Sequence, residues 1–236
     1  MSSRGEPQVL HVDNHVLVLH KPAGLPCVPD SSGDPSLLDW GKAWIAQEFQ
    51  KPGKVFLGVV HRLDRPVSGV VILGRTSKGA ARLSDSFRRH DLVKTYWAVV
   101  SKPVQPEQGE LKQWLLKDAQ RNTVRQVPAE QLDAKLGHTS YRTLATQGRR
   151  TLMELIPHTG RPHQLRVAMA SQGSPLLGDL RYGATEPLPD RSVALHAVSL
   201  RIPHPTLDVP LHLVCAPPEL DAWDFDGLAK RVEALR

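Results

Sequence analysis

Residues 55–73 read VFLGVVHRLDRPVSGVVIL, in which two β-rich apolar runs flank a polar segment, His61–Gly69. The runs Val55–Val60 and Val70–Leu73 are short and rich in valine, a pattern typical of strands. The polar segment is therefore predicted to be a turn or loop held by two strands. It gathers a carboxylate, Asp64, two guanidinium groups and a hydroxyl into nine residues, and loops held in this way commonly carry function.

The chain before this stretch predicts two strands and a helix. Gln8–His20 alternates apolar and polar residues around Asp13–Asn14, as expected of two short strands joined by a tight turn. Apolar residues recur at helical spacing over Leu37–Ile45, and Asp34–Pro35 precede them as a cap and a first-turn proline. The pattern stops at Lys51–Gly53, where proline and glycine end the helix.

The chain after it predicts further strands and three more helices. Thr76 or Ser77 can cap a helix, Thr159–Pro162 resembles another helix start, and a closing helix is expected from about Pro218. The expected strands are Lys94–Val100, Gly109–Leu116, Thr139–Thr146, Thr151–Ile156, Leu195–Ile202 and Leu211–Cys215.

The balance of these elements predicts the fold class. Strands outnumber helices and many connections are short, which favours an α+β fold with a mostly antiparallel sheet and helices on its faces over a doubly wound parallel fold. We expect a flexible N-terminus over residues 1–7 and a single catalytic domain over residues 8–236.

Composition limits the partners and the compartment. The 236 residues carry 30 Lys+Arg against 24 Asp+Glu, a net charge of +6 that favours a polyanionic partner through counterion release. No apolar run approaches the roughly 18 residues of a spanning helix, and the first residues lack a signal-peptide block, so we expect a cytoplasmic protein without membrane contact. Cys27 and Cys215 have no disulfide or zinc spacing and are expected to be reduced bystanders.

A second polar segment, Thr159–Arg166, adds a possible anion site. It collects two arginines, a histidine and an amide near a helix N-terminus, where backbone amides favour anions. His163 and Arg166, three residues apart, are expected to share a helix face. Without further support, a capped helix with an exposed basic face explains this segment equally well, just as solvated ion pairs of Asp64 and Arg65 explain the first.

Taken together, the two segments resemble the RluA-type RNA pseudouridine synthases, in several separated places and in chain order. His61–Asp64 with Ser68–Gly69 looks like the catalytic motif of that family, Lys94–Val99 resembles its second motif, and Thr159–Arg166 is similar to its third. The resemblance runs from about residue 8 to residue 215. Further agreement comes from Lys21–Pro26, Gly178–Gly183, Leu195–Ala197 and His204–Pro205.

The resemblance implies an isomerase that converts a specific uridine of structured rRNA or tRNA to pseudouridine. It implies a bent, mixed sheet flanked by helices, with a central active-site cleft. Asp64 would be the essential catalytic carboxylate, Tyr96 the active-site tyrosine and Arg166 the arginine that pairs with Asp64. No cofactor and no metal are implied. We expect a monomer without a separate N-terminal RNA-binding domain.

The reaction explains why such residues are needed. An ionised carboxylate can attack C1′ of the ribose or C6 of the ring, and a nearby arginine lowers its pKa. Tyr96 can stack on the base and move a proton late in the reaction. The target base must leave its stack, and Arg62 can fill the vacated space or, alternatively, bind a phosphate. Other basic residues could line the RNA path, namely His61, Lys21, Arg161 and His163.

Some positions depart from the family pattern, and other functions were weighed. Val67, Pro162 and Ala168 stand where other residues are usual, which leaves the substrate contacts less certain. The main alternative is a catalytically silent RNA-binding protein on the same fold. A glycosidase would need a second carboxylate such as Asp179 or Glu154. A metal site is weaker still, because the histidines match no familiar ligand spacing; these are His11, His15, His20, His158 and His163.

Overall fold

The computed structural model describes residues 5–236, which form two compact units. The first unit contains residues 5–93, 197–218 and 229–236, and the second contains residues 94–196 and 219–228. The predicted single domain over residues 8–236 stays a prediction. Of the predicted flexible N-terminus, residues 1–4 lie outside the described part of the chain.

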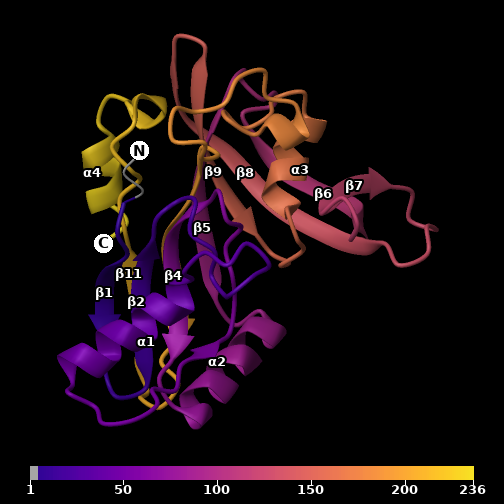
Figure 1. Ribbon diagram of the computed structural model, residues 1–236. Coiled ribbons are helices and arrows are strands. Elements are labelled where there is room, and N and C mark those ends of the chain that lie inside the picture. Colours follow the sequence, from indigo (N-terminus) through magenta and orange to yellow (C-terminus); the bar gives the residue numbers. More distant parts are fainter. Residues whose placement is uncertain (1–4) are drawn as a thin grey trace. The chain divides into compact units, whose positions relative to one another are not determined.

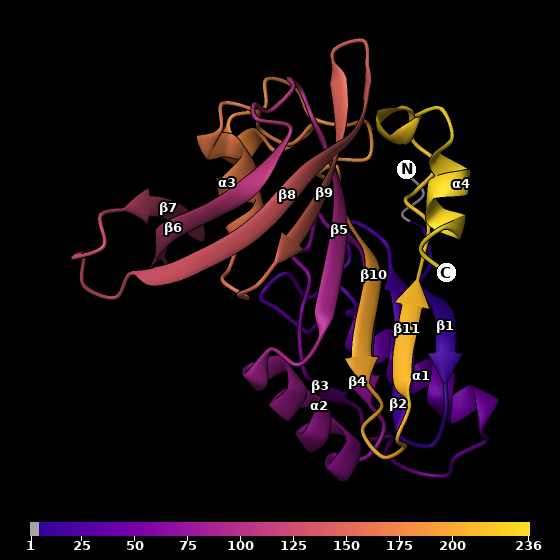
Figure 2. The same ribbon diagram turned by 180° about the vertical axis from the view of Figure 1, so that it is seen from behind.

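The first unit is built on strands in the order β1-β2-β4-β10, with β11 paired to β10 and β3 to β4 (Figures 1 and 2). The pairs β1–β2, β2–β4, β3–β4 and β10–β11 are all antiparallel. The strands are β1 (Gln8–Val12), β2 (Val16–Lys21), β3 (Gly58–Val59), β4 (Ser68–Gly74), β10 (Leu195–Pro203) and β11 (Pro210–Val214).

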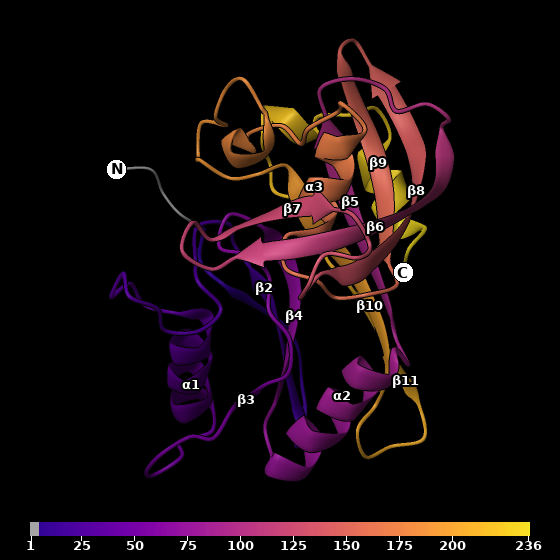
Figure 3. The ribbon, with the colours of Figure 1, turned by 90° about the vertical axis from the view of Figure 1, so that its right-hand side faces the viewer.

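Two helices of this unit lie on opposite sides of β2 and β4 (Figure 3). Leu17 and Leu19 face α1 (Leu37–Glu48), where Gly41 leaves room for both leucines. Val16 and Val18 face the other way and join a cluster with Leu83 of α2 (Ser77–Arg89). Because β2 is covered on both faces, its apolar residues form a continuous run instead of alternating with polar ones.

The second unit contains an antiparallel sheet in the order β5-β9-β8-β6-β7. Helix α3 (Gln164–Ser171) lies on one face of β8 and β9, as the opposite views in Figures 1 and 2 show. The strands are β5 (Val93–Val100), β6 (Gln108–Asp118), β7 (Thr123–Val127), β8 (Lys135–Gln147) and β9 (Arg150–Pro157). Short 3-10 turns of this unit cover Leu180–Tyr182 and Asp221–Trp223, whereas α4 (Leu228–Glu233) belongs to the first unit except for its first residue.

Strand pairing assigns each side chain of this sheet to a face. Tyr96 is opposite Leu155, which is opposite Tyr141, so these three share one face. Thr139 lies on that face as well, because it is two residues from Tyr141, and Gln164 of α3 bonds to it. Tyr96 and α3 are therefore on the same face of the sheet, and His138, next to Thr139, points to the other.

The predicted fold class is confirmed, since strands dominate and the described pairs of both units are antiparallel. No helix in the described residues is long and apolar enough to span a membrane. Several boundaries were wrong. The strand expected over Val55–Val60 pairs only at Gly58–Val59, the strand β7 was missed, and the closing helix begins at Leu228, ten residues after Pro218.

The cap of α1 is another correction. Ser36, not Asp34, is the N-cap: its hydroxyl accepts from the backbone N–H of Asp39, and the Asp39 carboxylate accepts from the backbone N–H of Ser36. This reciprocal pair satisfies two amides that the helix leaves open. Asp34 pairs with Arg65 instead. The cap of α2 is Thr76, one of the two residues predicted.

Candidate active site

The segment that resembles the family's catalytic motif lies on the loop between β3 and β4, and buried residues hold it on both sides of Asp64. The N–H of Val67 donates to the carbonyl of Asp64 at 3.0 Å. Leu63 is buried, and its backbone bonds to Cys27: the N–H lies 3.3 Å from Sγ, and the thiol lies 3.4 Å from the carbonyl oxygen. Cys27 is therefore part of the support of the loop and not a bystander. Asp64 itself remains half-buried.

Lys21 is fully buried beneath the same loop. Its ammonium group donates to the carbonyls of Pro22, Leu25 and Arg65 at 3.0, 2.8 and 3.2 Å. Burial lowers the pKa of Lys21 to about 8, while the nearby charge of Asp64 opposes that shift. The expectation that Lys21 lines the RNA path is therefore wrong, because a fully buried ammonium group bonded to three carbonyls holds the loop instead.

Arg65 ties the loop to the chain that follows β2. Its Nε donates to the carbonyl of Gly24 at 3.0 Å, and the N–H of Gly24 donates back to the carbonyl of Arg65 at 2.8 Å. The guanidinium also bonds to Ser32 and pairs with Asp34. The residue after Asp64 is thus anchored through both its backbone and its side chain.

His61 and Gly69 close the two ends of the motif. Nε2 of His61 accepts the backbone N–H of Ile72 at 3.0 Å, and its ring stacks on Phe87 with centroids 4.6 Å apart. That nitrogen carries no proton, so His61 contributes to structure, and its predicted role in RNA binding stays a prediction. Gly69 has φ +126°, and a Cβ there would lie 2.5 Å from the backbone of Ala197. Only glycine fits this position. Arg62 is exposed.

In the second unit, Arg166 forms a buried ion pair. Its Nε and Nη2 donate to the two carboxylate oxygens of Asp179, both at 2.7 Å, and the two side chains are 6% and 1% exposed. The guanidinium carbon also lies 5.0 Å from the ring centre of Tyr182. Asp179 and Tyr182 lie in the segment Gly178–Gly183, which agrees with the family pattern, but the sequence alone predicts neither of these contacts. Their appearance three residues apart between two glycines was the available signal.

Tyr182 joins three parts of this unit. Its hydroxyl accepts the N–H of Val124 at 2.9 Å and lies 2.6 Å from Nδ1 of His163. Burial raises the pKa of Tyr182. His163 has φ 50° and precedes the helix, which begins at Gln164. The expectation that His163 shares a helix face with Arg166 is therefore wrong, because a left-handed residue lies outside the helical repeat.

The side chain of Gln164 fixes the segment that leads into α3. Its Oε1 accepts from the Thr159 hydroxyl at 2.7 Å and from the N–H of Arg161 at 3.1 Å. Its Nε2 donates to the carbonyl of His138 and to the hydroxyl of Thr139, both at 2.9 Å. All hydrogen-bonding groups of this amide thus serve the fold. Arg161, bonded to the carbonyl of Leu136, remains partly exposed.

Each unit gathers part of the predicted site. The first unit holds Asp64, Arg62 and His61 on one loop, above Lys21. The second unit holds Tyr96, half-buried on β5. It also holds Arg161, His163 and Arg166 at the start of α3. The predicted pair of Asp64 with Arg166 joins residues of different units and stays a prediction. A half-buried carboxylate on a well-anchored loop can serve as a nucleophile.

A family model described as RNA pseudouridylate synthase matches residues 15–171, which include Asp64, Tyr96 and Arg166. The dual-specificity RNA pseudouridine synthase RluA of Yersinia pestis is 33% identical over 209 residues, covering 88% of this chain and 97% of that protein. An uncharacterized RNA pseudouridine synthase of Zymomonas mobilis is 34% identical over 196 residues, covering 83% of this chain and 87% of its own. The chain spans 66% of the YhcT protein of Bacillus subtilis, at 33% identity.

Two solved human structures share the fold. RNA pseudouridylate synthase domain containing 4 is 26% identical, with a TM-score of 0.75 over 89% of this chain and 88% of its own. RNA pseudouridylate synthase domain containing 1 has a TM-score of 0.73 over 100% of this chain and 96% of its own. At 22% identity this second likeness concerns the fold alone.

Proposed function

Since the chain belongs to the RNA pseudouridylate synthase family, we propose that Asp64 is the nucleophile with which it isomerises a specific uridine of a structured rRNA or tRNA. The chain is an RNA pseudouridine synthase, an isomerase. The observation that supports Asp64 most directly is its loop. Lys21, Cys27 and the backbone of Gly24 hold the neighbouring residues, while the carboxylate remains partly exposed.

The isomerisation requires that one bond be broken and another formed at the same carbon. A carboxylate oxygen of Asp64 attacks C1′, and the bond to N1 breaks with its electron pair on the uracil. The turned base then attacks C1′ through C5, the carboxylate leaves, and the proton on C5 is lost while N1 gains one. Attack at C6 of the ring is the other route open to the same carboxylate. In both cases a fixed carboxylate lowers the entropic cost of reaching the transition state.

Tyr96, Arg166 and Arg62 have separate tasks in this proposal. Tyr96 stacks on the uracil, and its hydroxyl moves the late proton. Arg166, held by Asp179, is the residue that we propose to pair with the Asp64 carboxylate and fix its orientation during the reaction. Arg62, exposed on the loop, enters the space that the target base leaves when it flips out of its stack, which costs a few kcal/mol.

The substrate is identified by mapping pseudouridines in total RNA from cells with and without this protein. The positions that are lost on deletion name the RNA and the uridine. Complementation with Asp64→Asn should fail to restore them, whereas the matched exposed carboxylate variant Asp208→Asn should restore them fully.

Purified variants test the role of Asp64 itself. Asp64→Ala should remain folded and bind the mapped RNA with nearly the affinity of the unchanged protein, because the carboxylate acts on the barrier and not on docking. Its turnover should be undetectable. Binding and single-turnover rate are measured on one preparation. Turnover of about a tenth of the original or more would exclude Asp64 as the nucleophile. Urea unfolding of the same preparation shows whether the variant is folded.

A further inference from the structure

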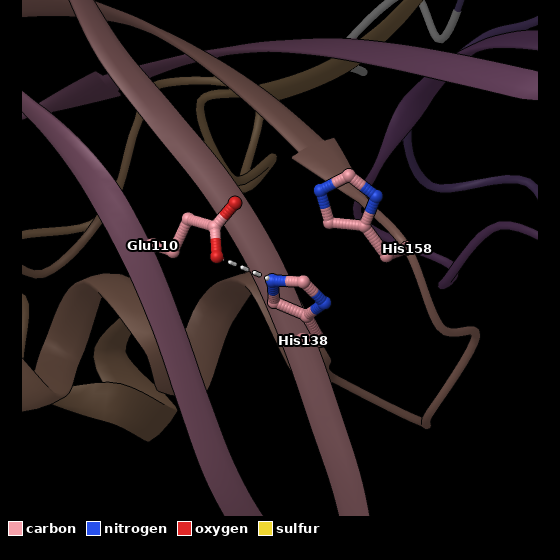
Figure 4. Close-up of side chains that lie close together, drawn as sticks. All are labelled: Glu110, His138 and His158. Carbon is pink, nitrogen blue, oxygen red and sulfur yellow. Dashed lines mark hydrogen bonds and ion pairs between the residues drawn. The ribbon is translucent and has the colours of Figure 1, made fainter.

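Three potential metal ligands meet on the second unit's sheet, on the face opposite Tyr96 and α3. Figure 4 shows the carboxylate of Glu110 beside the imidazole rings of His138 and His158. One ligand atom from each of the three residues lies within 4.8 Å of the other two. Glu110 comes from β6, His138 from β8, and His158 follows the last residue of β9. None of the three belongs to the site proposed above.

Strand pairing holds the three residues together. Thr139 is opposite Pro157, and the N–H of His158 donates to the carbonyl of His138 at 2.9 Å, so the ladder continues by one residue. The two imidazole rings lie 4.3 Å apart between centroids. Oε2 of Glu110 lies 3.1 Å from Nε2 of His138. The arrangement depends on registers between strands far apart in the chain, which is why histidine spacing in the sequence did not reveal it.

We propose that Glu110, His138 and His158 bind one divalent transition-metal ion of the zinc type. Two imidazoles with one carboxylate form a ligand set that suits Zn²⁺, whereas Mg²⁺ requires oxygen ligands. The three residues leave at least one coordination position for water. The ion would lie on the sheet face away from Tyr96 and would take no part in the isomerisation.

The distances are compatible with closure around an ion. Zinc binds nitrogen and oxygen ligands at about 2.0–2.2 Å, so its ligands lie roughly 3.3 Å from one another. In this structure the ligand atoms are within 4.8 Å, and Glu110 and His158 are exposed enough to rotate. Small changes in side-chain torsion therefore suffice, without movement of the strands.

Binding has an electrostatic cost and a contact cost. The ligands must be an ionised carboxylate and neutral imidazoles, so the existing contact between Oε2 of Glu110 and Nε2 of His138 must be given up. Lys94 and Lys112 lie close enough to contribute unfavourable positive charge, and binding must also displace the Ser140 hydroxyl, 2.6 Å from Nε2 of His158.

The position of the site predicts what the ion does. It would join β6 and β8 to His158, the first residue of the segment that leads from β9 to α3. A bound ion should therefore stabilise the native state by mass action, RT ln(1 + [L]/Kd), without altering the chemistry.

Calorimetric titration of the metal-free full chain with ZnCl₂ tests this proposal. The unchanged protein should bind one equivalent, and the affinity should fall by about tenfold or more in Glu110→Gln and in the double variant His138→Gln/His158→Gln. The control variant His90→Asn/His212→Gln removes two exposed histidines elsewhere and should bind as the unchanged protein does. MgCl₂ should neither bind nor compete.

Thermal unfolding supplies a second measurement on the same proteins. Zn²⁺ should raise the Tm of the unchanged protein and of the control, but not that of His138→Gln/His158→Gln. The metal-free Tm of this variant should stay close to the original, because His158 is exposed, His138 is partly exposed and glutamine can keep a polar contact at both positions. Equal zinc affinity in this variant and the unchanged protein would overturn the proposal, as would a loss in the control alone. Absence of any one-equivalent binding would also overturn it.

Discussion

Lys21 shows how one residue can serve a site without touching a substrate. Its ammonium group donates to three carbonyls, one of them in the residue after Asp64, and that carbonyl also accepts the N–H of Gly24. An amine in such a place is costly to charge, which is why burial lowers its pKa to about 8 from the ordinary value of 10.5.

The pKa of Lys21 predicts a pH dependence of stability. Between pH 8 and 10.5 the unfolded chain binds a proton at Lys21 that the folded chain does not, so the free energy of unfolding gains from this group as pH rises, by about 1.4 kcal/mol per pH unit at most. Lys21→Met lacks this contribution. The stability difference between the unchanged protein and Lys21→Met, measured by urea unfolding at pH 7.5 and 9.5, should therefore grow with pH.

The exposed control Lys78→Met should show no such growth. Lys21→Met should also lose on the order of 3 kcal/mol at neutral pH, because the carbonyls of Pro22 and Leu25 lose the ammonium donor. A difference that is flat or falls with pH would mean that Lys21 is not charged in the way its burial implies.

The variant Arg62→Ala distinguishes a role in base flipping from simple attraction of a phosphate. If Arg62 fills the vacated stack, Arg62→Ala should slow single-turnover isomerisation strongly on a paired target uridine and much less on an unpaired one. Overall affinity should change little, because it is shared among many phosphate contacts. Arg88→Ala, which removes another exposed arginine, should leave the rate at saturating RNA unchanged.

A different pattern would assign Arg62 to a phosphate. The variant would then weaken binding to all RNAs alike and lower the slope of log affinity against log salt by about 0.7 to 0.9. An unchanged rate at saturating RNA together with that uniform loss would rule out the flipping role.

At the scale of elements, α3 depends on a charge outside it. Asp179 is 1% exposed and bonds to Arg166 through both oxygens. Removing one partner of a buried ion pair leaves the other charge buried without a counter-charge, which lowers the free energy of unfolding by about 3–5 kcal/mol. We therefore expect Asp179→Asn to lower the free energy of unfolding by an amount in this range, measured by urea unfolding.

A surface pair provides the comparison for Asp179. Asp118→Asn breaks an exposed contact with Arg121 and should cost less than about 1 kcal/mol. A cost of Asp179→Asn no larger than that would show that Arg166 is adequately charged and solvated without Asp179. The ion pair between Asp179 and Arg166 would then contribute little to the stability of the fold.

Much of the order of elements could be predicted from the sequence, because periodicity and caps are local. Both strands near Asp13–Asn14 and the helix after Thr76 follow from such signals. The predictions fail where a strand forms only because it pairs with a distant segment of the chain. Of the six-residue apolar run Val55–Val60, only Gly58–Val59 pairs with another strand. The strand β7 forms because Thr123–Val127 pairs with β6, and its polar residues give no local strand signal.

At the scale of the whole molecule, the catalytic proposal and the metal proposal predict opposite responses to a chelator. EDTA followed by dialysis should lower the Tm of zinc-loaded protein but leave isomerisation unchanged on a short or prefolded RNA, since the proposed ligands lie on the face away from Tyr96. Using a short RNA removes the effect of Mg²⁺ on RNA folding. A loss of activity that Zn²⁺ restores would contradict the metal-independent chemistry.

The sequence predicts the residues of the candidate site, which stay a prediction, but not the contacts that hold their loop in place. Asp64 lies on the loop that flanking strands predict, whereas Cys27 contacts Leu63, 36 residues away, and Lys21 contacts Arg65, 44 residues away. Such contacts follow from the packing of distant segments, which no local pattern encodes. Asp179 differs, because a motif pointed to it and only its partner Arg166 was unknown.

Because Cys27 supports the loop, the structure of the loop depends on its thiol remaining unmodified. While the chain is folded, burial raises the pKa of Cys27 and keeps reagents away from its sulfur. Oxidants and alkylating agents therefore cannot reach the sulfur, which stays a thiol and not the reactive thiolate. Each opening of the loop exposes the sulfur, and a group attached then would occupy the space needed by the backbone of Leu63. A loop modified while it is open could not return to its closed conformation. The rate at which Cys27 is labelled would therefore measure how often the loop that carries Asp64 opens.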